Sequence, residues 1–168
     1  MNAAVNAFFL ILKLLSLYFL VVSLFSLCKH KMQKSSTTQR RFAVLIAARN
    51  EESCIAGLIE SLLAQNYPSE LFDIWVLPNN CTDHTADAAR HAGGKVLEMP
   101  TSIHSKGAAL QYAANTLLHG SRYYDAFCVF DADNEVDPAF LSEMNQALSR
   151  SAIVKSRILA KNRMQAGI

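Results

Sequence analysis

The chain has 168 residues, which leaves room for one domain and an appendage, and 51% of its residues are hydrophobic. The formal net charge is only +2, and the basic residues gather around the N-terminal apolar segment and in the C-terminal tail. This distribution is better explained by anionic lipid than by nucleic acid, so we expect no nucleic-acid partner. The 4 cysteines form no C-x-x-C pair and have no histidine at zinc spacing, a pattern that fits a reducing compartment.

An apolar segment near the N-terminus is predicted to be a membrane anchor. Residues 8–28 hold one charge, Lys13. As a helix they would span about 32 Å, close to the ~30 Å hydrocarbon core of a bilayer. A cleaved signal peptide is the alternative, but residues 1–7 contain no Lys or Arg, and the bulky Leu27 stands beside the would-be cleavage site. We therefore expect a retained transmembrane helix.

The flanking charges predict the orientation of this helix. No basic residue precedes it, and several basic residues follow it: Lys29, Lys31, Lys34, Arg40 and Arg41. The positive-inside rule then places the N-terminus outside and the globular domain in the cytoplasm, as a single-pass membrane protein. The predicted domains are a transmembrane anchor at 1–29, a basic polar linker at 30–41, a binding domain at 42–150 and a basic tail at 151–168.

After the linker, strand and helix patterns alternate. Residues 42–47 form a continuous apolar run, as expected of a strand that is buried on both faces of a parallel sheet. In the helix that follows, we expect Asn50 to be the N-cap and Glu51 and Glu52 to lie in the first turn. The helix carries one apolar stripe, made of Ile55, Leu58, Ile59, Leu62 and Leu63.

The alternation continues through the rest of the domain. We expect further strands at 72–77, 95–98 and 126–130. The second helix is predicted to be capped by Thr82 or Asp83, and the third to cover about 106–118. A fourth helix should open at Asp137-Pro138. The predicted inward residues of the last two helices are Leu110, Ala114, Leu117, Leu118, Leu141, Met144 and Leu148. This order predicts a right-handed, mostly parallel α/β sheet with flanking helices.

Polar side chains follow the predicted strands at the ends where such sheets bind ligands. The clusters are 49–51 after the first strand, 79–83 after the second, and Asp131-Ala132-Asp133 after the fourth. Hard divalent cations such as Mg²⁺ prefer carboxylate oxygens and usually share them with substrate phosphates. The acidic pair therefore suggests a metal–diphosphate site, although an Asp at a strand end is also a common turn former or helix cap.

Four segments in this order resemble family 2 glycosyltransferases, the inverting enzymes of GT-A fold that use nucleotide-diphospho-sugars. The segments are Ala47-Ala48-Arg49-Asn50-Glu51-Glu52, Asn79-Asn80-Cys81-Thr82-Asp83-His84-Thr85, Ser105-Lys106-Gly107-Ala108-Ala109-Leu110 and Asp131-Ala132-Asp133. The resemblance covers about residues 42–148. It implies a GT-A, Rossmann-like fold, a hexosyltransferase-like activity and, as donor, most simply a UDP-sugar.

The resemblance also implies roles for particular residues. Arg49 and Glu51 would line the nucleotide pocket, and Asn79 would face the base edge at a position where the family usually has Asp. Lys106 would approach the diphosphate. Asp131 would contact the ribose or the metal, and Asp133 would bind Mg²⁺ or Mn²⁺. Asp83 and Asp137 are interpreted as helix caps.

The general base that deprotonates the acceptor hydroxyl is not identified in the sequence. The family carries it in a later acidic segment, followed by a motif with Gln, Arg and Trp. In this chain nothing after Glu143 is acidic, and the single Trp, Trp75, lies inside a predicted strand. We therefore expect a donor-binding part of a glycosyltransferase that works with a separate or missing C-terminal catalytic portion. The alternative is a non-catalytic or degenerate nucleotide-sugar-binding module.

Overall fold

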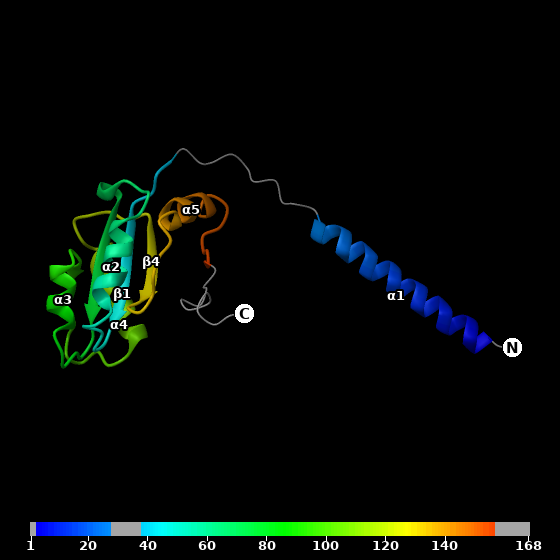
Figure 1. Ribbon diagram of the computed structural model, residues 1–168, viewed down its shortest axis with the longest axis horizontal. Coiled ribbons are helices and arrows are strands. Elements are labelled where there is room, and N and C mark those ends of the chain that lie inside the picture. The colour runs from blue at the N-terminus through cyan, green and yellow to red at the C-terminus, as the bar shows by residue number, and fades with distance from the viewer. Residues whose placement is uncertain (1–2, 28–37, 157–168) are drawn as a thin grey trace. The chain divides into compact units, whose positions relative to one another are not determined.

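The computed structural model describes residues 3–27 and 38–156, which belong to two compact units (Figure 1). The first unit contains one helix and the second contains the sheet. Cys28, most of the predicted linker and the end of the predicted basic tail lie outside the described residues.

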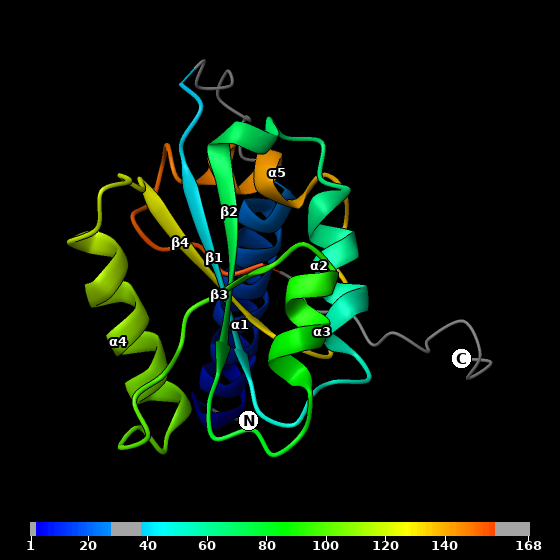
Figure 2. The same ribbon diagram turned by 90° about the vertical axis from the view of Figure 1, so that its left-hand side faces the viewer.

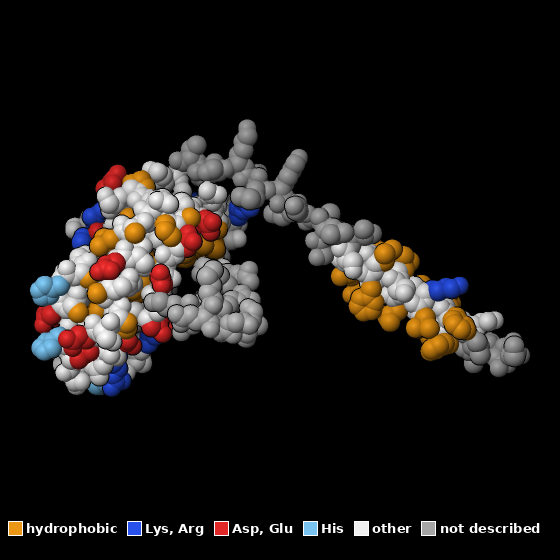
Figure 3. Space-filling model, in the orientation of Figure 1, with side chains coloured by type: hydrophobic (Ala, Val, Ile, Leu, Met, Phe, Trp, Pro, Cys, Tyr) orange, Lys and Arg blue, Asp and Glu red, His pale blue; other side chains and the backbone are white. Residues whose placement is uncertain are grey.

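In the N-terminal unit, the described residues form the helix α1, Ala3–Leu27. Apolar side chains run along it in Figure 3, and the large ones described from Phe8 to Val22 are all exposed. Within α1, residues 6–23 are long and apolar enough to cross a membrane, by length and composition alone. A helix that could span a bilayer is therefore confirmed, while its retention and orientation stay predictions.

The second unit is built on a four-stranded parallel sheet in the order β3-β2-β1-β4. The strands are β1 (Phe42–Ala48), β2 (Phe72–Pro78), β3 (Lys95–Val96) and β4 (Ala126–Asp131). The predicted parallel α/β sheet is confirmed, and the first, second and fourth strands lie where the apolar runs place them. Only β3 is clearly shorter than expected.

Helices cover the two faces of the sheet unequally (Figure 2). The chain forms α2 (Ile55–Leu63), a short 3-10 turn at Ser69–Leu71, α3 (Thr85–His91), α4 (Lys106–Leu118) and α5 (Phe140–Ala147). One core lies under α2, α3 and α5, where Val44 and Ile46 of β1 meet Leu58 and Ile59 of α2. A smaller core lies under α4 alone: Ala43, Leu45, Leu77, Ala113, Leu117 and Tyr124.

The structure corrects the predicted start of the first helix of the sheet unit. Asn50 is not its N-cap, because α2 begins only at Ile55 and Cys54 holds the cap position. Glu51 and Glu52 therefore belong to the loop before α2 and not to its first turn. Residues 50–52 instead form hydrogen bonds with the loop that follows β2.

Two predicted core leucines are exposed, Leu63 by 53% and Leu118 by 61%. Each directly follows a buried leucine, Leu62 or Leu117, so the turn of about 100° per helical residue directs it away from the core. On α4 the buried residues are Ala109, Ala113 and Leu117. The inward stripe is thus one residue earlier at two of its positions than we expected.

The strand β4 is less buried than its apolar sequence suggests. It pairs with β1 alone among the described strands, so it forms an edge of the sheet, and Val129 is 50% exposed. A continuous apolar run in an edge strand exposes surface that a central strand would bury.

A buried carboxylate ties the strands together at the end of the sheet where β2 begins. The Asp73 side chain is 6% exposed; it accepts hydrogen bonds from Lys95 Nζ at 2.7 Å and from the Tyr124 hydroxyl at 2.7 Å. Arg122 Nε forms an ion pair with Asp73 Oδ2 at 3.0 Å, the same oxygen that accepts from Tyr124. Burial raises the pKa of Asp73, but the bonds from Lys95 and Tyr124 and the two positive charges outweigh it and hold the pKa below its usual value.

We predict that Asp73→Asn destabilises the domain by about 2 kcal/mol, because a buried charge-assisted network loses its charge. A depressed carboxyl pKa stabilises the fold above the unfolded-state pKa of about 4, and this stabilisation is lost as the pH falls through the folded-state pKa. The variant should therefore lose less stability than the wild type on acidification below about pH 4.

The measurement is denaturant unfolding of the full chain in detergent, followed by fluorescence of Trp75, whose Nε1 donates to the Tyr124 hydroxyl at 3.2 Å. Glu98→Gln is the control, since it removes an exposed ion pair with Arg90 and should leave stability unchanged. If both substitutions lowered the free energy of unfolding equally, the stabilising role assigned to Asp73 would be contradicted.

Candidate functional site

The candidate site lies beyond the carboxyl ends of the strands, where the chain changes direction across the sheet. From β1 the chain proceeds outward to β2 and β3, and then returns through α4 to β4 on the other side of β1. The ends of the three strands are level, because Ala48 pairs with Pro78 and Ala47 pairs with Asp131. In open α/β sheets, ligands usually bind in the region just outside the carboxyl ends of the strands, which we call the crevice.

Side-chain hydrogen bonds join the loop after β1 to the loop after β2. Asn50 Oδ1 accepts from the Thr82 backbone N–H at 2.8 Å, and Asp83 Oδ2 accepts from that of Glu52 at 3.2 Å. The hydroxyl of Thr85 accepts from the Glu51 backbone N–H at 2.9 Å. These contacts hold two predicted site loops together, in the lower part of Figure 2.

Two asparagines give these loops their sharp turns. Asn50 has φ 59° and Asn80 has φ 52°, and they are the non-glycine residues with positive φ among those described. Asparagine tolerates this left-handed region better than most residues do. Strain of this kind persists where surrounding contacts fix it, and it is concentrated at functional sites.

The second loop is in turn joined to the segment before α4. Asn79 is buried, 7% exposed, and its backbone N–H donates to the Ala48 carbonyl at 2.9 Å. Its neighbour Asn80 donates from Nδ2 to Asn79 Oδ1 at 2.9 Å and to the Ile103 carbonyl at 2.7 Å. Asn79 is therefore buried just after β2, and its side-chain oxygen accepts from Asn80.

A direct ion pair brings the predicted lysine to the acidic motif. Lys106 Nζ contacts Asp131 Oδ1, with the two side chains 50% and 61% exposed. The Ser105 side chain caps α4 by accepting from the Ala108 N–H at 3.2 Å, so the helix begins where Lys106 meets the end of β4. Asn134 Oδ1 accepts from the Asp131 N–H at 3.1 Å and shapes the turn that follows.

Asp133 faces the loop after β1. The Cys54 thiol donates to Glu51 Oε2 at 3.0 Å. Burial, this bond and the negative charges of Glu51 and Asp133 raise the pKa of the Cys54 thiol to about 11. The thiol is therefore protonated at neutral pH, and it serves to hold the Glu51 carboxylate rather than to react as a nucleophile.

The acidic motif matches one mode of metal binding. In the described ranges, no group of three or more His, Cys, Asp or Glu side chains could hold an ion. A protein cage is therefore not formed there. Asp131 and Asp133 do fit a Mg²⁺ or Mn²⁺ site of the kind that uses one or two carboxylates and completes its shell with water and substrate phosphate.

The predicted site residues are thus distributed over one crevice, but not all of them touch. Lys106 contacts Asp131, and Glu51 is tied to the loop after β2. Arg49 is exposed just after β1, and in the portion of the chain that is described its side chain has no hydrogen bond or ion pair. It is available to a ligand.

Sequence analysis missed the residues that organise the loops, Asn50, Asn80 and Thr85. The available signal was the placement of asparagine directly after two buried strands, which is typical of left-handed turn positions. Thr85 is fully buried and resembles an ordinary helix residue in the sequence. Its role depends on a backbone N–H that is 34 residues away in the chain.

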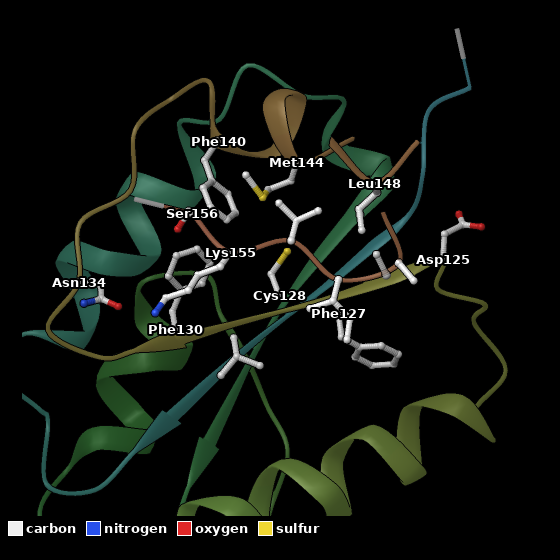
Figure 4. Close-up of a pocket in the computed structure, with 15 residues that line it drawn as sticks. Asp125, Phe127, Cys128, Phe130, Asn134, Phe140, Met144, Leu148, Lys155 and Ser156 are labelled. Carbon is white, nitrogen blue, oxygen red and sulfur yellow. The ribbon is translucent and has the colours of Figure 1, made fainter. Parts of the chain in front are cut away.

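A separate apolar groove of about 660 Å³ runs along the open edge of β4 (Figure 4). Phe130 and Cys128 of β4 line it together with Phe140, Met144 and Leu148 of the segment that contains α5. The groove explains why Met144 and Leu148 are only partly buried. It does not contain the acidic pair, but Asn134, which accepts from the Asp131 N–H, is among its lining residues.

Comparison with known proteins identifies the family. The sequence model of Glycosyl transferase family 2 matches residues 43–166, and the chain belongs to this family. A beta-monoglucosyldiacylglycerol synthase of Nostoc is 40% identical over 43 residues, which are 26% of this chain and 9% of that protein. The Synechocystis protein of the same name is 29% identical over 51 residues, 30% of this chain and 11% of that protein.

Solved structures share the fold. The mannosyltransferase PcManGT of Pyrobaculum calidifontis, in complex with GDP-Man and Mn²⁺, has a TM-score of 0.62 at 20% identity, covering 77% of this chain and 39% of that one. TarS of S. aureus has a TM-score of 0.54 at 21% identity, covering 65% and 32%. The predicted GT-A fold is confirmed. The chain spans about a third of the length of these structures.

The bond between Thr85 and Asp83 yields a test of how the loops are held. The Asp83 carboxylate accepts from the Thr85 hydroxyl at 2.5 Å and from the Thr85 N–H at 3.1 Å. The hydroxyl bond is the largest cause of a pKa of Asp83 below its usual value. We predict that Thr85→Val raises this pKa toward that of a free Asp, whereas Thr85→Ser keeps it depressed.

The pKa of Asp83 can be measured by carboxyl-carbon NMR titration of the full chain. Val nearly matches the shape of Thr, and Ser keeps the hydroxyl, so the two variants separate the lost bond from lost packing. An Asp83 pKa unchanged in Thr85→Val would show that the bond does not hold the loop in solution.

Proposed function

We propose that this chain is the donor-binding part of a membrane-anchored glycosyltransferase. It binds a nucleotide-diphospho-sugar with a divalent metal for inverting sugar transfer. Membership of family 2 supports the reaction class. The ligands bound in two structures of similar fold, GDP-Man with Mn²⁺ in PcManGT and UDP in TarS, support the class of donor.

The observation that carries this proposal is the contact between Lys106 and Asp131. It puts a cation and the acidic motif at one point, although they stand on different elements of the chain. A diphosphate needs both a positive side chain and a metal-binding carboxylate within reach. With donor bound, the Lys106 ammonium would turn from Asp131 to the phosphate oxygens as a point charge on a flexible stem.

The other site residues would hold the nucleoside. Asn79, which is buried just after β2, would face the base. Arg49 and Glu51, in the loop after β1, would line the same pocket around the ribose and base. The restraint of Glu51 by Cys54 and Thr85 supports a defined role for this loop, because a pocket wall must be preorganised to bind tightly.

Asp131 and Asp133 would hold Mg²⁺ or Mn²⁺. The ion would supply charge neutralisation for the nucleoside diphosphate as it departs from the sugar. The Lys106 ammonium, at the start of α4, would bind the phosphate oxygens beside these carboxylates. Asp137 has another role, since its Oδ1 accepts from the Ala139 N–H at 2.8 Å just before α5.

The helix α1 would anchor the domain at a membrane, with the domain in the cytoplasm and the N-terminus outside. The helix is apolar enough to span, and the basic residues that follow it support this orientation. The acceptor-activating base is not among the residues assigned above. We propose that a C-terminal catalytic portion supplies it, in the same or a separate polypeptide.

Calorimetry on the full chain in detergent tests the site. UDP, CDP, GDP and ADP are each titrated with and without Mn²⁺. At least one should bind, and Mn²⁺ should tighten its binding by about tenfold or more, because an ion held by Asp131 and Asp133 would neutralise phosphate charge. Asp133→Asn should abolish most of this gain, and the nearby Asp137→Asn should keep it.

Unchanged metal dependence in Asp133→Asn would contradict the metal assignment. Failure of all four nucleotides to bind in either condition would contradict the donor-binding function as a whole.

A further inference from the structure

Asn79, which is proposed to face the base, has an incomplete set of side-chain hydrogen bonds. It is 7% exposed, yet only one of its two side-chain polar atoms has a partner in the parts of the chain that the structure describes. An amide carries an acceptor oxygen and a donor NH₂ group, and which of them faces a ligand decides what the ligand must offer in return.

The direction of this amide is fixed by its neighbour. Asn80 Nδ2 lies 2.7 Å from the Ile103 carbonyl, which can only accept, so this nitrogen is assigned from the network without ambiguity. The same nitrogen is 2.9 Å from Asn79 Oδ1. Because Asn80 presents a donor there, Asn79 must present its oxygen to Asn80. Its NH₂ group is left pointing away from this contact.

The NH₂ group of Asn79 is not sealed from solvent. Over residues 3–27 and 38–156, the fully buried side-chain nitrogen or oxygen without a hydrogen-bond partner is Arg122 Nε. Asn79 Nδ2 also lacks a partner but is not sealed, so it is reachable from solvent. A donor that is mostly desolvated and unpaired costs free energy until a ligand acceptor meets it.

Bases differ at the centre of their pairing edge. Cytosine N3 and adenine N1 are acceptors, whereas uracil N3 and guanine N1 carry a hydrogen. A carboxylate at this position would accept from the uracil N3–H. The Asn79 NH₂ group would instead place a donor against that hydrogen, which is unfavourable. It would pair with a base that has an acceptor at this position.

We infer that Asn79, held in this orientation by Asn80, selects a nucleoside diphosphate whose base presents an acceptor at the centre of its pairing edge. Within each size class, the site prefers CDP to UDP and ADP to GDP. Asn79 is the specificity-determining residue and Asn80 is its positioning residue. This inference rests on the proposed function, and it revises the UDP-sugar that the family resemblance implies.

Competition calorimetry on the full chain with Mn²⁺ tests the inference through two affinity ratios, CDP to UDP and ADP to GDP. The wild type should favour CDP over UDP by about tenfold, the usual effect of one mispaired buried hydrogen bond. Asn79→Asp should reverse the CDP to UDP ratio, because the carboxylate only accepts.

Asn80→Asp is the sharper variant, since it leaves Asn79 unchanged. An acceptor at residue 80 should attract the Asn79 NH₂ group and turn the Asn79 oxygen to the base, and the CDP to UDP ratio should fall by about tenfold. Aspartate also tolerates the positive φ of 52° at this position. Asn66→Asp, which adds the same charge beyond the far end of α2, should leave both ratios unchanged.

The inference is overturned if the wild type binds UDP as tightly as CDP and neither substitution changes the ratio, even though Mn²⁺-dependent binding is present. That result would leave the donor-binding function intact. Absence of binding by all four nucleotides would overturn both. Because each readout is a ratio, a general loss of affinity from the added charge does not imitate a change in selectivity.

Discussion

Everything in the sheet unit depends on the position of β1 between two parallel neighbours. β1 pairs with β2 on one side and with β4 on the other. Parallel pairing puts all three carboxyl ends at one edge, so the loops that follow these strands begin next to one another. The meeting of these loops is thus a consequence of strand order.

The side chains then convert this crevice into a defined site by linking each loop to the next. Asn50 and Thr85 connect the loops after β1 and β2, Asn80 connects the latter to the segment before α4, and Lys106 connects α4 to the end of β4. These turns require the left-handed backbone conformation of Asn50 and Asn80, which is locally strained. A buried network around Asp73 stabilises the sheet at the end of β2 away from the site.

The sequence predicts the strands and helices that follow from a local pattern of apolar residues. Apolar runs locate β1 and β2, and α4 covers the predicted residues because Ser105 caps it and the chain turns beyond Leu118. The strand-end positions of the polar clusters were also predictable. Features that depend on distant partners were not. The role of Asn50 needs Thr82, the exposure of β4 depends on which strands flank it, and the amide direction of Asn79 needs the Ile103 carbonyl.

The central claim is that separate loops meet around one metal-bound diphosphate. Paramagnetic broadening of backbone NMR signals by Mn²⁺ tests it most directly, on the full chain with CDP or UDP and with Mg²⁺ as the diamagnetic reference. The account predicts that signals of Arg49, Asn79 and Asp131 broaden together, while those of Asp73 and Arg122 persist. Broadening that is confined to one loop, or centred near Asp73, would contradict it.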